Sequence, residues 1–238
     1  MDLKIKDVAE LLSVSETTIR RWLLDGKIPA YKLNRQYRFS KIEIENWMME
    51  QRLNPLAAKT SFPPVAEPVQ IYPRGEEPPA RSGMQQFSLY RAINRGGVLV
   101  DVAGETKEEI IRNVMGEISA TLRMDRDVLS ELLLDREKMM PTAFNNGIAV
   151  PHARECLQHV PFDLITVAFP QKPIEYGALD KKPVEALFFL FATGDKIHLH
   201  LLAKLAHLSS NEKALNFLST KPTKSSLLEF IREWETTL

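Results

Sequence analysis

Residues 136–154 read REKMMPTAFNNGIAVPHAR, and this stretch decides the fold of the larger part of the chain. Within it, residues 148–150 form a short apolar run after Gly147, which fits a buried strand. Pro151 and His152 follow directly. The strand and the proline fix the histidine on a rigid edge, in a loop exposed to a partner protein. Because neutral imidazole is a nucleophile near its pKa, this placement suits chemistry at His152.

The segments on either side of this stretch alternate between strands and helices. The predicted strands are residues 98–102, 148–150, 164–169 and 184–191. The predicted helices are residues 87–93, 106–122, 125–134, 198–208 and 225–234. This order predicts an α/β domain of layered type, with helices on a mixed sheet.

Prolines mark a boundary between this domain and a smaller one. Seven of the fifteen prolines lie between residues 53 and 82, where no helical or strand periodicity is found. We therefore divide the chain into a head (residues 1–52), a linker (53–86) and a tail (87–238). The head has ten Lys/Arg and eight Asp/Glu, a net charge of +2, whereas the tail has eighteen and twenty, a net charge of −2.

The overall composition limits where the protein acts. The net charge is zero, so any DNA binding must depend on a local basic patch. The single cysteine, Cys156, excludes an intrachain disulfide and favours the cytosol. The longest apolar run, residues 186–192, is too short to span a bilayer, and the first residues do not resemble a secretion signal. We expect a cytoplasmic protein without membrane insertion.

The head has the pattern of a small winged helix-turn-helix domain. Residues 6–12 are expected to form a first helix, and Ser15 to cap a second helix that ends before Gly26. Two short strands at residues 29–33 and 37–39 follow, and residues 40–43 form a capping box for a third helix whose Trp47 faces inward.

Two stretches of the head, KDVAELLSVSETTIRRWLLDGKIPAYKL and RQYRFSKIEIENWM, resemble the excisionase/MerR-type DNA-binding module. The resemblance implies that the second helix enters the major groove. The side chains that would then face DNA are Glu16, Thr17, Arg20 and Arg21 on this helix, and Arg35 and Arg38 on the hairpin. The alternative is that these are ordinary solvated charges, in a module that docks a protein or forms dimers.

Three motifs of the tail resemble a second family. The stretches GIAVPHA (residues 147–153), HLHLLAKLA (198–206) and REK (136–138) are similar to those of phosphotransferase-system enzyme IIA domains of the fructose, mannitol and nitrogen-regulatory type. The resemblance implies that His152 accepts a phosphoryl group and that His198 hydrogen-bonds its oxygens. Asn145 stands where the family often has glycine, and we expect it to adopt the same turn.

Other polar residues near these motifs leave alternatives open. Arg136 either supplies a fixed positive charge to the phosphoryl group or forms a salt bridge at a helix end. His200 replaces His198 as the partner if the helix register differs by a turn. His159 and His207 are expected at the surface or as satisfied core residues. No motif supports Cys156 as a nucleophile, so we interpret it as a buried thiol.

These observations predict a regulatory protein of the phosphotransferase system. No metal-ligand set is apparent in the sequence, and phosphoryl transfer between two histidines needs no cofactor. An HPr-type phosphocarrier protein would phosphorylate His152, and the phosphorylation state would control DNA binding and transcription, in keeping with nitrogen regulation. Alternatively, the tail is a phosphocarrier for a sugar-specific IIB. In a third reading, the head docks the tail onto a regulated kinase or transporter.

Overall fold

The computed structural model describes residues 2–12, 14–33, 36–53, 88–153 and 162–237. The linker from residue 54 onward, the hairpin turn with Arg35, and the segment with Cys156 and His159 lie outside these ranges. Expectations about those residues therefore stay predictions.

The head is a helix-turn-helix domain with a small antiparallel sheet. Its elements are β1 (Asp2–Leu3), α1 (Ile5–Leu11), α2 (Glu16–Leu24), β2 (Tyr31–Leu33), β3 (Gln36–Ser40) and α3 (Lys41–Leu53). The strand order is β1-β3-β2. Ser15 caps α2 by accepting a hydrogen bond from the backbone N–H of Thr18 at 3.1 Å, as its sequence position predicts. Trp47 is buried, as expected.

The tail is an α/β domain around a mixed four-stranded sheet. Its elements are α5 (Ser88–Gly96), β4 (Val98–Val102), α6 (Lys107–Leu122), α7 (Arg126–Met139), β5 (Ile148–Ala149), β6 (Leu164–Pro170), β7 (Ala186–Phe191), α8 (Asp195–Leu208), α9 (Glu212–Leu218) and α10 (Lys224–Thr236). The strand order is β4-β6-β7-β5, with β6 and β7 antiparallel and each outer strand parallel to its neighbour. The prediction of a mixed sheet with flanking helices is confirmed.

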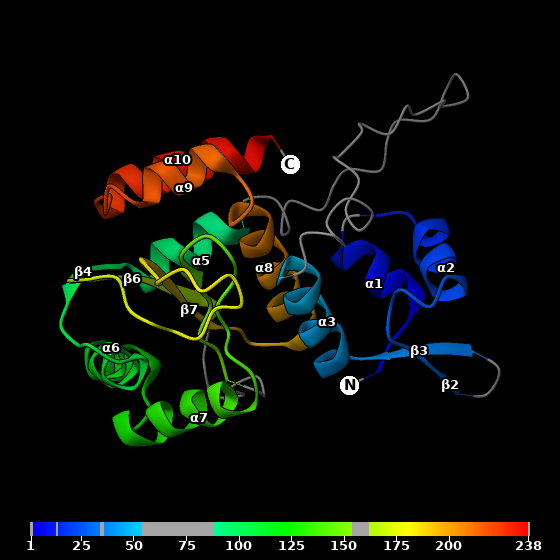
Figure 1. The fold of residues 1–238 in the computed structure, drawn as a ribbon, viewed down its shortest axis with the longest axis horizontal. Helices are drawn as coiled ribbons and strands as arrows, with labels where there is room; N and C mark the ends of the chain where they lie inside the picture. Colours follow the sequence, from blue (N-terminus) through cyan, green and yellow to red (C-terminus); the bar gives the residue numbers. More distant parts are fainter. Residues whose placement is uncertain (1, 13, 34–35, 54–87, 154–161, 238) are drawn as a thin grey trace.

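Helices cover both faces of this sheet (Figure 1). Alternate residues of β6 and β7 point to opposite faces, as the two-residue repeat of a strand requires. Val167 and Phe188 pack in the cluster with α5, α8 and α10, whereas Ala168 and Phe189 pack in the cluster with α6 and α7. Both faces are apolar because both are buried, so the strands read as continuous hydrophobic runs.

The turn before β5 differs from the expectation for Asn145. The residues with positive φ there are Asn146 (66°) and Gly147 (76°), whereas Asn145 is not among them. The left-handed conformation is therefore shifted by one position, to an asparagine and a glycine, the residue types that tolerate it best. At this turn the positive φ is thus found at Asn146 and Gly147, next to Asn145.

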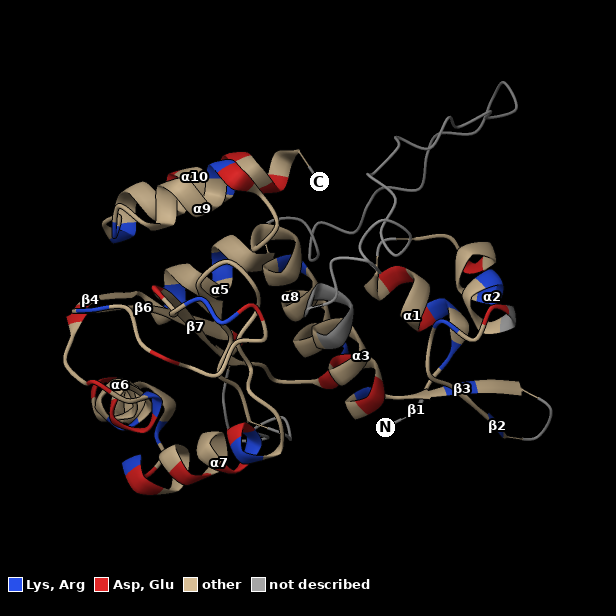
Figure 2. Ribbon diagram, viewed as in Figure 1, with Lys and Arg blue, Asp and Glu red and all other residues tan. Residues whose placement is uncertain are grey.

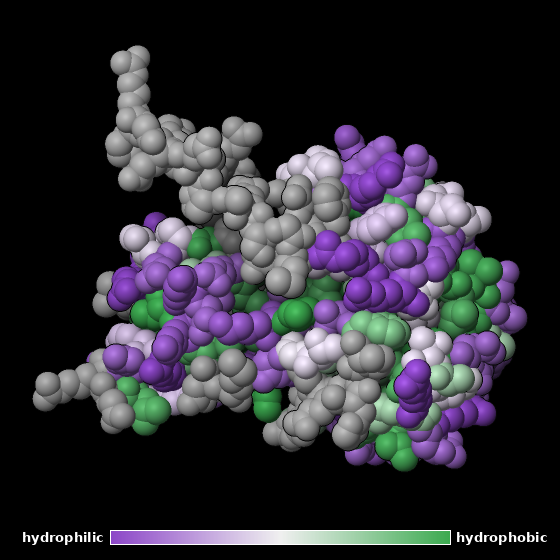
Figure 3. All heavy atoms as spheres, turned by 180° about the vertical axis from the view of Figure 1, so that it is seen from behind, coloured by the Kyte–Doolittle hydropathy of each residue, from purple (hydrophilic) through white to green (hydrophobic). Residues whose placement is uncertain are grey.

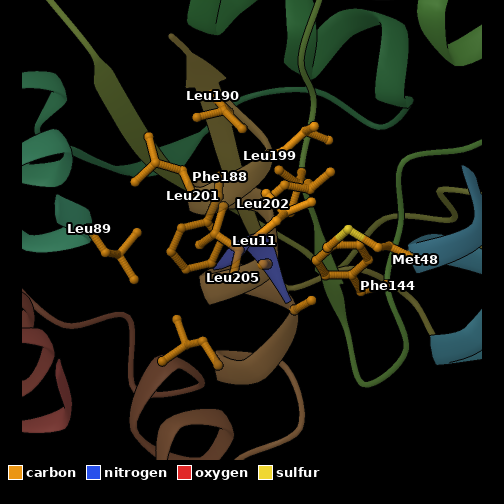
Figure 4. Close-up of a cluster of buried hydrophobic side chains, with 14 of the residues drawn as sticks. Leu11, Met48, Leu89, Phe144, Phe188, Leu190, Leu199, Leu201, Leu202 and Leu205 are labelled. Atoms are coloured by element: carbon orange, nitrogen blue, oxygen red, sulfur yellow. The ribbon is translucent and has the colours of Figure 1, made fainter. Parts of the chain in front are cut away.

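The head packs against the tail through α1 and α3, which both lie beside α8 (Figure 1). One hydrophobic cluster continues across this boundary. Leu11 and Met48 of the head belong to the same cluster as Phe144 and Leu199 of the tail, and Figure 4 shows Met48 next to Phe144. The two domains therefore share part of a core.

The surface of the molecule is largely hydrophilic where Figure 3 shows it, and hydrophobic side chains form small separate patches there. Among the helices of the described ranges, none is long and apolar enough to cross a membrane.

Candidate functional site

His152 is held at the edge of the sheet by the strand that precedes it. β5 pairs with β7, and the backbone N–H of Leu190 donates a hydrogen bond to the carbonyl of Pro151 at 2.9 Å. His152 itself forms a bridge with Leu190, so the backbone of the histidine continues the sheet. The residue is fully buried, in contrast to the exposed loop that the sequence led us to expect. Packing of the head over the loop is the reason.

The hydrogen bonds of His152 fix which ring nitrogen faces the site. Nδ1 lies 2.7 Å from the carbonyl oxygen of Val150. A carbonyl only accepts, so Nδ1 carries a proton and donates it. The other nitrogen, Nε2, points into the site and meets the carboxylate of Glu45 in a short contact. Nε2 is therefore the ring atom available for chemistry once that contact is removed.

Glu45 belongs to α3 of the head, yet its carboxylate lies in the middle of the tail's histidine site. Its Oε1 is 3.4 Å from both Nε and Nη2 of Arg136, and its side chain is almost fully buried. Burial raises the pKa of Glu45, but His152, His198 and Arg136 together outweigh it and hold the pKa at about 2. The carboxylate is therefore charged in this environment.

His198 lies beside His152 at the start of α8. The two ring centroids are 5.1 Å apart, nearly edge to face. In the described part of the chain, Nε2 of His198 is buried without a hydrogen-bond partner, and Oε2 of Glu45 is 3.8 Å away. Burial, followed by the nearby His152, lowers the pKa of His198 to about 3, so its ring is neutral here.

Arg136 contacts both the end of its own helix and the carboxylate of Glu45. Its Nη1 donates to the carbonyl of Met140 at 3.0 Å, closing the end of α7, while the rest of the guanidinium faces Glu45. His200, in contrast, turns away from the site. Its Nε2 lies 3.1 Å from the hydroxyl of Ser88, so the helix register places His198 next to His152.

A buried carboxylate supports the loop that carries His152. Glu137 accepts hydrogen bonds from the backbone N–H of Thr142 at 3.1 Å, from the Thr142 hydroxyl and from the Tyr176 hydroxyl at 3.0 Å. The carbonyl of Thr142 in turn accepts from the N–H of Val150 at 2.9 Å. Glu137 therefore positions the segment from which His152 projects.

The site also groups ligand atoms of the kind that metals use. One atom each from Glu45, His152 and His198 lies within 4.8 Å of the others. The sequence showed no such set, because Glu45 is separated from the histidines by more than 100 residues. The guanidinium of Arg136 beside the same carboxylate opposes a second positive charge, so the arrangement fits an anion better than a divalent cation.

Helix α2, which carries most of the residues expected to face DNA, lies on the side of the head away from the tail (Figure 2). Thr17, Arg20 and Arg21 of α2 are exposed. Arg20 pairs with Glu16 at 3.2 Å, and Arg38 donates to Gln36 at 3.0 Å. An exposed i,i+4 ion pair stabilises a helix by only about 0.3–0.5 kcal/mol, so Arg20 remains free to contact phosphate.

Sequence reasoning assigned no role to Glu45 or Glu137, although both stood in quoted motifs. For Glu137 a signal existed, since it lies in the REK motif beside Arg136. For Glu45 the only signal is a spacing of four and three residues that links Lys41, Glu45 and Met48 along one face of α3, where all three are buried.

Comparisons with known proteins agree with this geometry. The model of the EIIA 2 family of the phosphoenolpyruvate-dependent sugar phosphotransferase system matches residues 92–234, and a helix-turn-helix family model matches residues 3–52. A nitrogen regulatory protein of Pseudomonas aeruginosa is 30% identical over 60% of this chain and 94% of its own length. One from Escherichia coli K12 is 28% identical over 63% of this chain and 93% of its own length.

Among solved structures, nitrogen regulatory protein IIA-Ntr of Neisseria meningitidis has a TM-score of 0.52 at 23% identity, covering 57% of this chain and 92% of its own. The fold and the paired histidines thus define a phosphocarrier domain of the phosphotransferase system, preceded by a helix-turn-helix domain. The chain belongs to the EIIA 2 family of that system.

Proposed function

We propose that Nε2 of His152 accepts a phosphoryl group from an HPr-type phosphocarrier protein, and that this phosphorylation controls DNA binding by the head. The observation that carries the first part is the geometry of the ring. Nδ1 is held by Val150, and Nε2 faces the carboxylate of Glu45, around which Arg136 and His198 are also grouped. Arg136 and His198 are the groups that a transferring phosphoryl needs, because its catalysis is mostly positioning and charge stabilisation.

The transfer exchanges one nitrogen–phosphorus bond for another. The lone pair of the unprotonated Nε2 bonds to phosphorus as the bond to the donor's imidazole breaks. The bonding electron pair stays on the donor nitrogen, which takes up a proton from solvent. Glu45 moves away from Nε2 before the attack, and Nδ1 keeps its proton, which it donates to the carbonyl of Val150. Arg136 and the neutral His198 bind the phosphoryl oxygens.

The proposal for DNA is supported by the surface of the head. Helix α2 lies on the side of the head away from the tail (Figure 2), its Thr17 and Arg21 are exposed, and a helix-turn-helix family model matches the head. Arg20, Arg35 and Arg38 complete the set that we propose to contact DNA. The joining of such a reader to a phosphate-accepting domain motivates a regulator, which we place in the cytoplasm.

A second function is favoured by one observation, the packing of the head on a protein surface. α1 and α3 contact α8, so the head is able to dock protein as well as DNA. In this alternative the tail delivers phosphate to a sugar-specific IIB, and the head serves as a docking module for it or for a regulated kinase or transporter. Transfer of phosphate from the purified phosphoprotein to a sugar-specific IIB would favour this function.

The acceptor is tested by intact mass. The full chain is incubated with phosphoenolpyruvate, enzyme I and an HPr-type carrier, beside His152→Ala and His200→Ala. We expect one acid-labile phosphate on the wild type and on His200→Ala, and none on His152→Ala. Equal phosphate on the wild type and on His152→Ala would show that the acceptor is another residue.

The coupling to DNA needs a separate measurement. A DNA sequence is selected from a random pool with the wild-type chain, and its affinity is measured at one salt concentration before and after phosphorylation. We expect the affinity of the wild type to change and that of His152→Ala to stay constant under the same treatment. Identical affinities of both forms of the wild type would contradict the coupling.

A further inference from the structure

Glu45 gives the histidine site a charge that comes from outside the EIIA 2 domain. The family match begins at residue 92, whereas Glu45 lies on α3 of the head. Its carboxylate nevertheless contacts Nε2 of His152, the guanidinium of Arg136 and the edge of His198. An anion from one domain therefore occupies the anion site of the other.

The carboxylate of Glu45 does not satisfy every hydrogen-bonding group of this site. Glu45 offers two oxygens. Oε1 meets His152 and Arg136, whereas Oε2 lies 3.8 Å from Nε2 of His198, beyond hydrogen-bond distance. Nε2 of His198 is left buried without a hydrogen-bond partner among the described residues. A phosphoryl group has three oxygens, so the site has more binding groups than a carboxylate satisfies.

Contacts around Glu45 align the two domains. On α3, Lys41 forms a largely buried ion pair with Asp195 at 2.9 Å, and Met48 packs by Phe144 (Figure 4). These residues share one face of α3 with Glu45, at helical spacing. One face of α3 therefore contacts the tail along its length, and Glu45 lies in the middle of that face.

We propose that Glu45 is a built-in substitute for the phosphoryl group: the head docks on the unphosphorylated site through Glu45, and phosphorylation of His152 expels Glu45 and releases the head. This inference rests on the proposed acceptor role of His152. The exclusion is steric and electrostatic, because phosphorus on Nε2 takes the place of Oε1 and brings about −1.5 to −2 charges next to a carboxylate.

Release of the head changes how freely helix α2 can reorient relative to the tail, whereas the exposure of α2 to solvent stays the same. In the docked form the tail covers α1 and α3, while Thr17 and Arg21 on α2 are already exposed. Docking therefore fixes the orientation of α2 relative to the tail. Phosphorylation would therefore release the head from this fixed orientation, while the head stays joined to the tail through the chain.

The docking is tested on the full chain by the distance between two spin labels. Labels are placed on exposed positions by Lys27→Cys in the head and Glu117→Cys in the tail, with Cys156→Ser to remove the native thiol. Charge reversal by Glu45→Lys puts two cations together at Arg136. Glu43→Lys, at an exposed position of the same helix, is the matched control.

Without phosphoryl donor, we expect a single narrow distance for the wild type and for Glu43→Lys, and a broad, longer distribution for Glu45→Lys. With phosphoenolpyruvate, enzyme I and an HPr-type carrier, the wild type should become broad as well. Equal distributions for the wild type and Glu45→Lys without donor would overturn the role of Glu45. A phosphorylated wild type with an unchanged narrow distance would overturn the exclusion while leaving the acceptor role intact.

The rate of phosphorylation gives a second readout. Loss of the buried contact of Glu45 shifts the equilibrium between docked and released head strongly towards release. Because release uncovers His152, Glu45→Lys should be phosphorylated at least about tenfold faster than the wild type. Glu43→Lys should match the wild type. Absence of phosphate from every variant would refute the acceptor role of His152. The spin-label distance measured without phosphoryl donor would still test whether Glu45 holds the head on the tail. If zinc narrowed the wild-type distribution and chelation broadened it, a metal centre would replace this proposal.

Discussion

Glu137 illustrates how a single buried carboxylate positions the acceptor without touching it. Its carboxylate accepts three hydrogen bonds, from the backbone N–H and the hydroxyl of Thr142 and from the hydroxyl of Tyr176. In Glu137→Gln an amide NH₂ faces one of these donors, so we expect a loss of about 1–3 kcal/mol in the free energy of unfolding. The rate of phosphorylation of His152 should fall as well. Denaturant unfolding and the phosphorylation time course measure the two effects.

Glu131→Gln on the same helix is the control for this prediction. Glu131 forms an exposed ion pair with Arg112, and such pairs are worth only about 0–1 kcal/mol. If Glu137→Gln unfolded at the same denaturant concentration as Glu131→Gln, the buried network would not support the loop.

His198 makes docking of the head sensitive to acid. Its pKa is about 3 in the docked form, where it faces His152, Glu45, Lys41 and Asp195, against an ordinary value near 6.5. Above pH 6.5 the ring is neutral whether docked or open. As the pH falls from 6.5 towards 3, the open form binds a proton that the docked form does not, so docking weakens.

The expected weakening is about 1.4 kcal/mol for each pH unit below 6.5. Glu45, with a pKa of about 2 against an ordinary 4.5, acts in the same direction only below pH 4.5. The spin-label distance should therefore broaden between pH 7 and pH 5. In His198→Gln the broadening should be much smaller, and an equal response would assign it to another group.

The elements that could be predicted from the sequence are those with caps or long periodic patterns. α2 begins after Ser15 and α6 after Thr106, as the capping residues indicate, and the apolar runs of β6 and β7 are strands. β1 and α9 were missed. With 2 and 7 residues, they are too short for a hydrophobic period to show, and β1 exists only because it pairs with β3.

The histidine site could be predicted only in part. His152, His198 and Arg136 lie in the recognised motifs, and the structure brings them together. Glu45 could not be predicted, because its contact depends on how the head packs on the tail, and no local pattern of α3 contains that information. The expectation of an exposed acceptor loop failed for the same reason.

The ion pair between α3 and α8 tests the docked arrangement of these two helices. Lys41 and Asp195 are 2.9 Å apart, with Lys41 almost fully buried. Either Lys41→Asp or Asp195→Lys alone places like charges together and should open the interface. The exchange of both should restore much of the narrow spin-label distance. If the double variant were as open as the single ones, the helices would not meet in this register.

Helix α2 carries the prediction for DNA contacts. Arg21 is exposed, so Arg21→Ala should leave stability unchanged while weakening DNA binding. A phosphate contact would cost affinity evenly across sequences and lower the salt slope by about 1, whereas a bidentate base contact would cost about 1–3 kcal/mol for the selected sequence alone. Titrations at several salt concentrations distinguish these. Lys213→Ala, at an exposed position of α9, is the control, and an equal loss there would argue against α2 as the DNA-reading helix.

Within the whole molecule, the linker decides how strongly the two domains meet. Because the head and the tail belong to one chain, the head has an effective concentration near the tail of the order of millimolar. The shared hydrophobic cluster with Leu11, Met48 and Phe144 adds to the contact of Glu45. Docking therefore combines an apolar interface, ion pairs and the contact of Glu45, and in our proposal phosphorylation acts on the contact of Glu45 alone. A device of this kind is reversible, since loss of the phosphoryl group restores the docked form.

Cutting the linker separates the contribution of the tether from that of the interface. A protease site is inserted between residues 54 and 87, outside the described ranges, and the folded chain is cleaved. At micromolar protein we expect the head and tail of the wild type to leave a sizing column together, and to separate on dilution because the effective concentration is lost. After phosphorylation of His152, and in Glu45→Lys without it, the halves should separate at every concentration. Phosphorylated halves that still eluted together would show that the apolar interface alone holds the head, so that phosphate on His152 could not control its release.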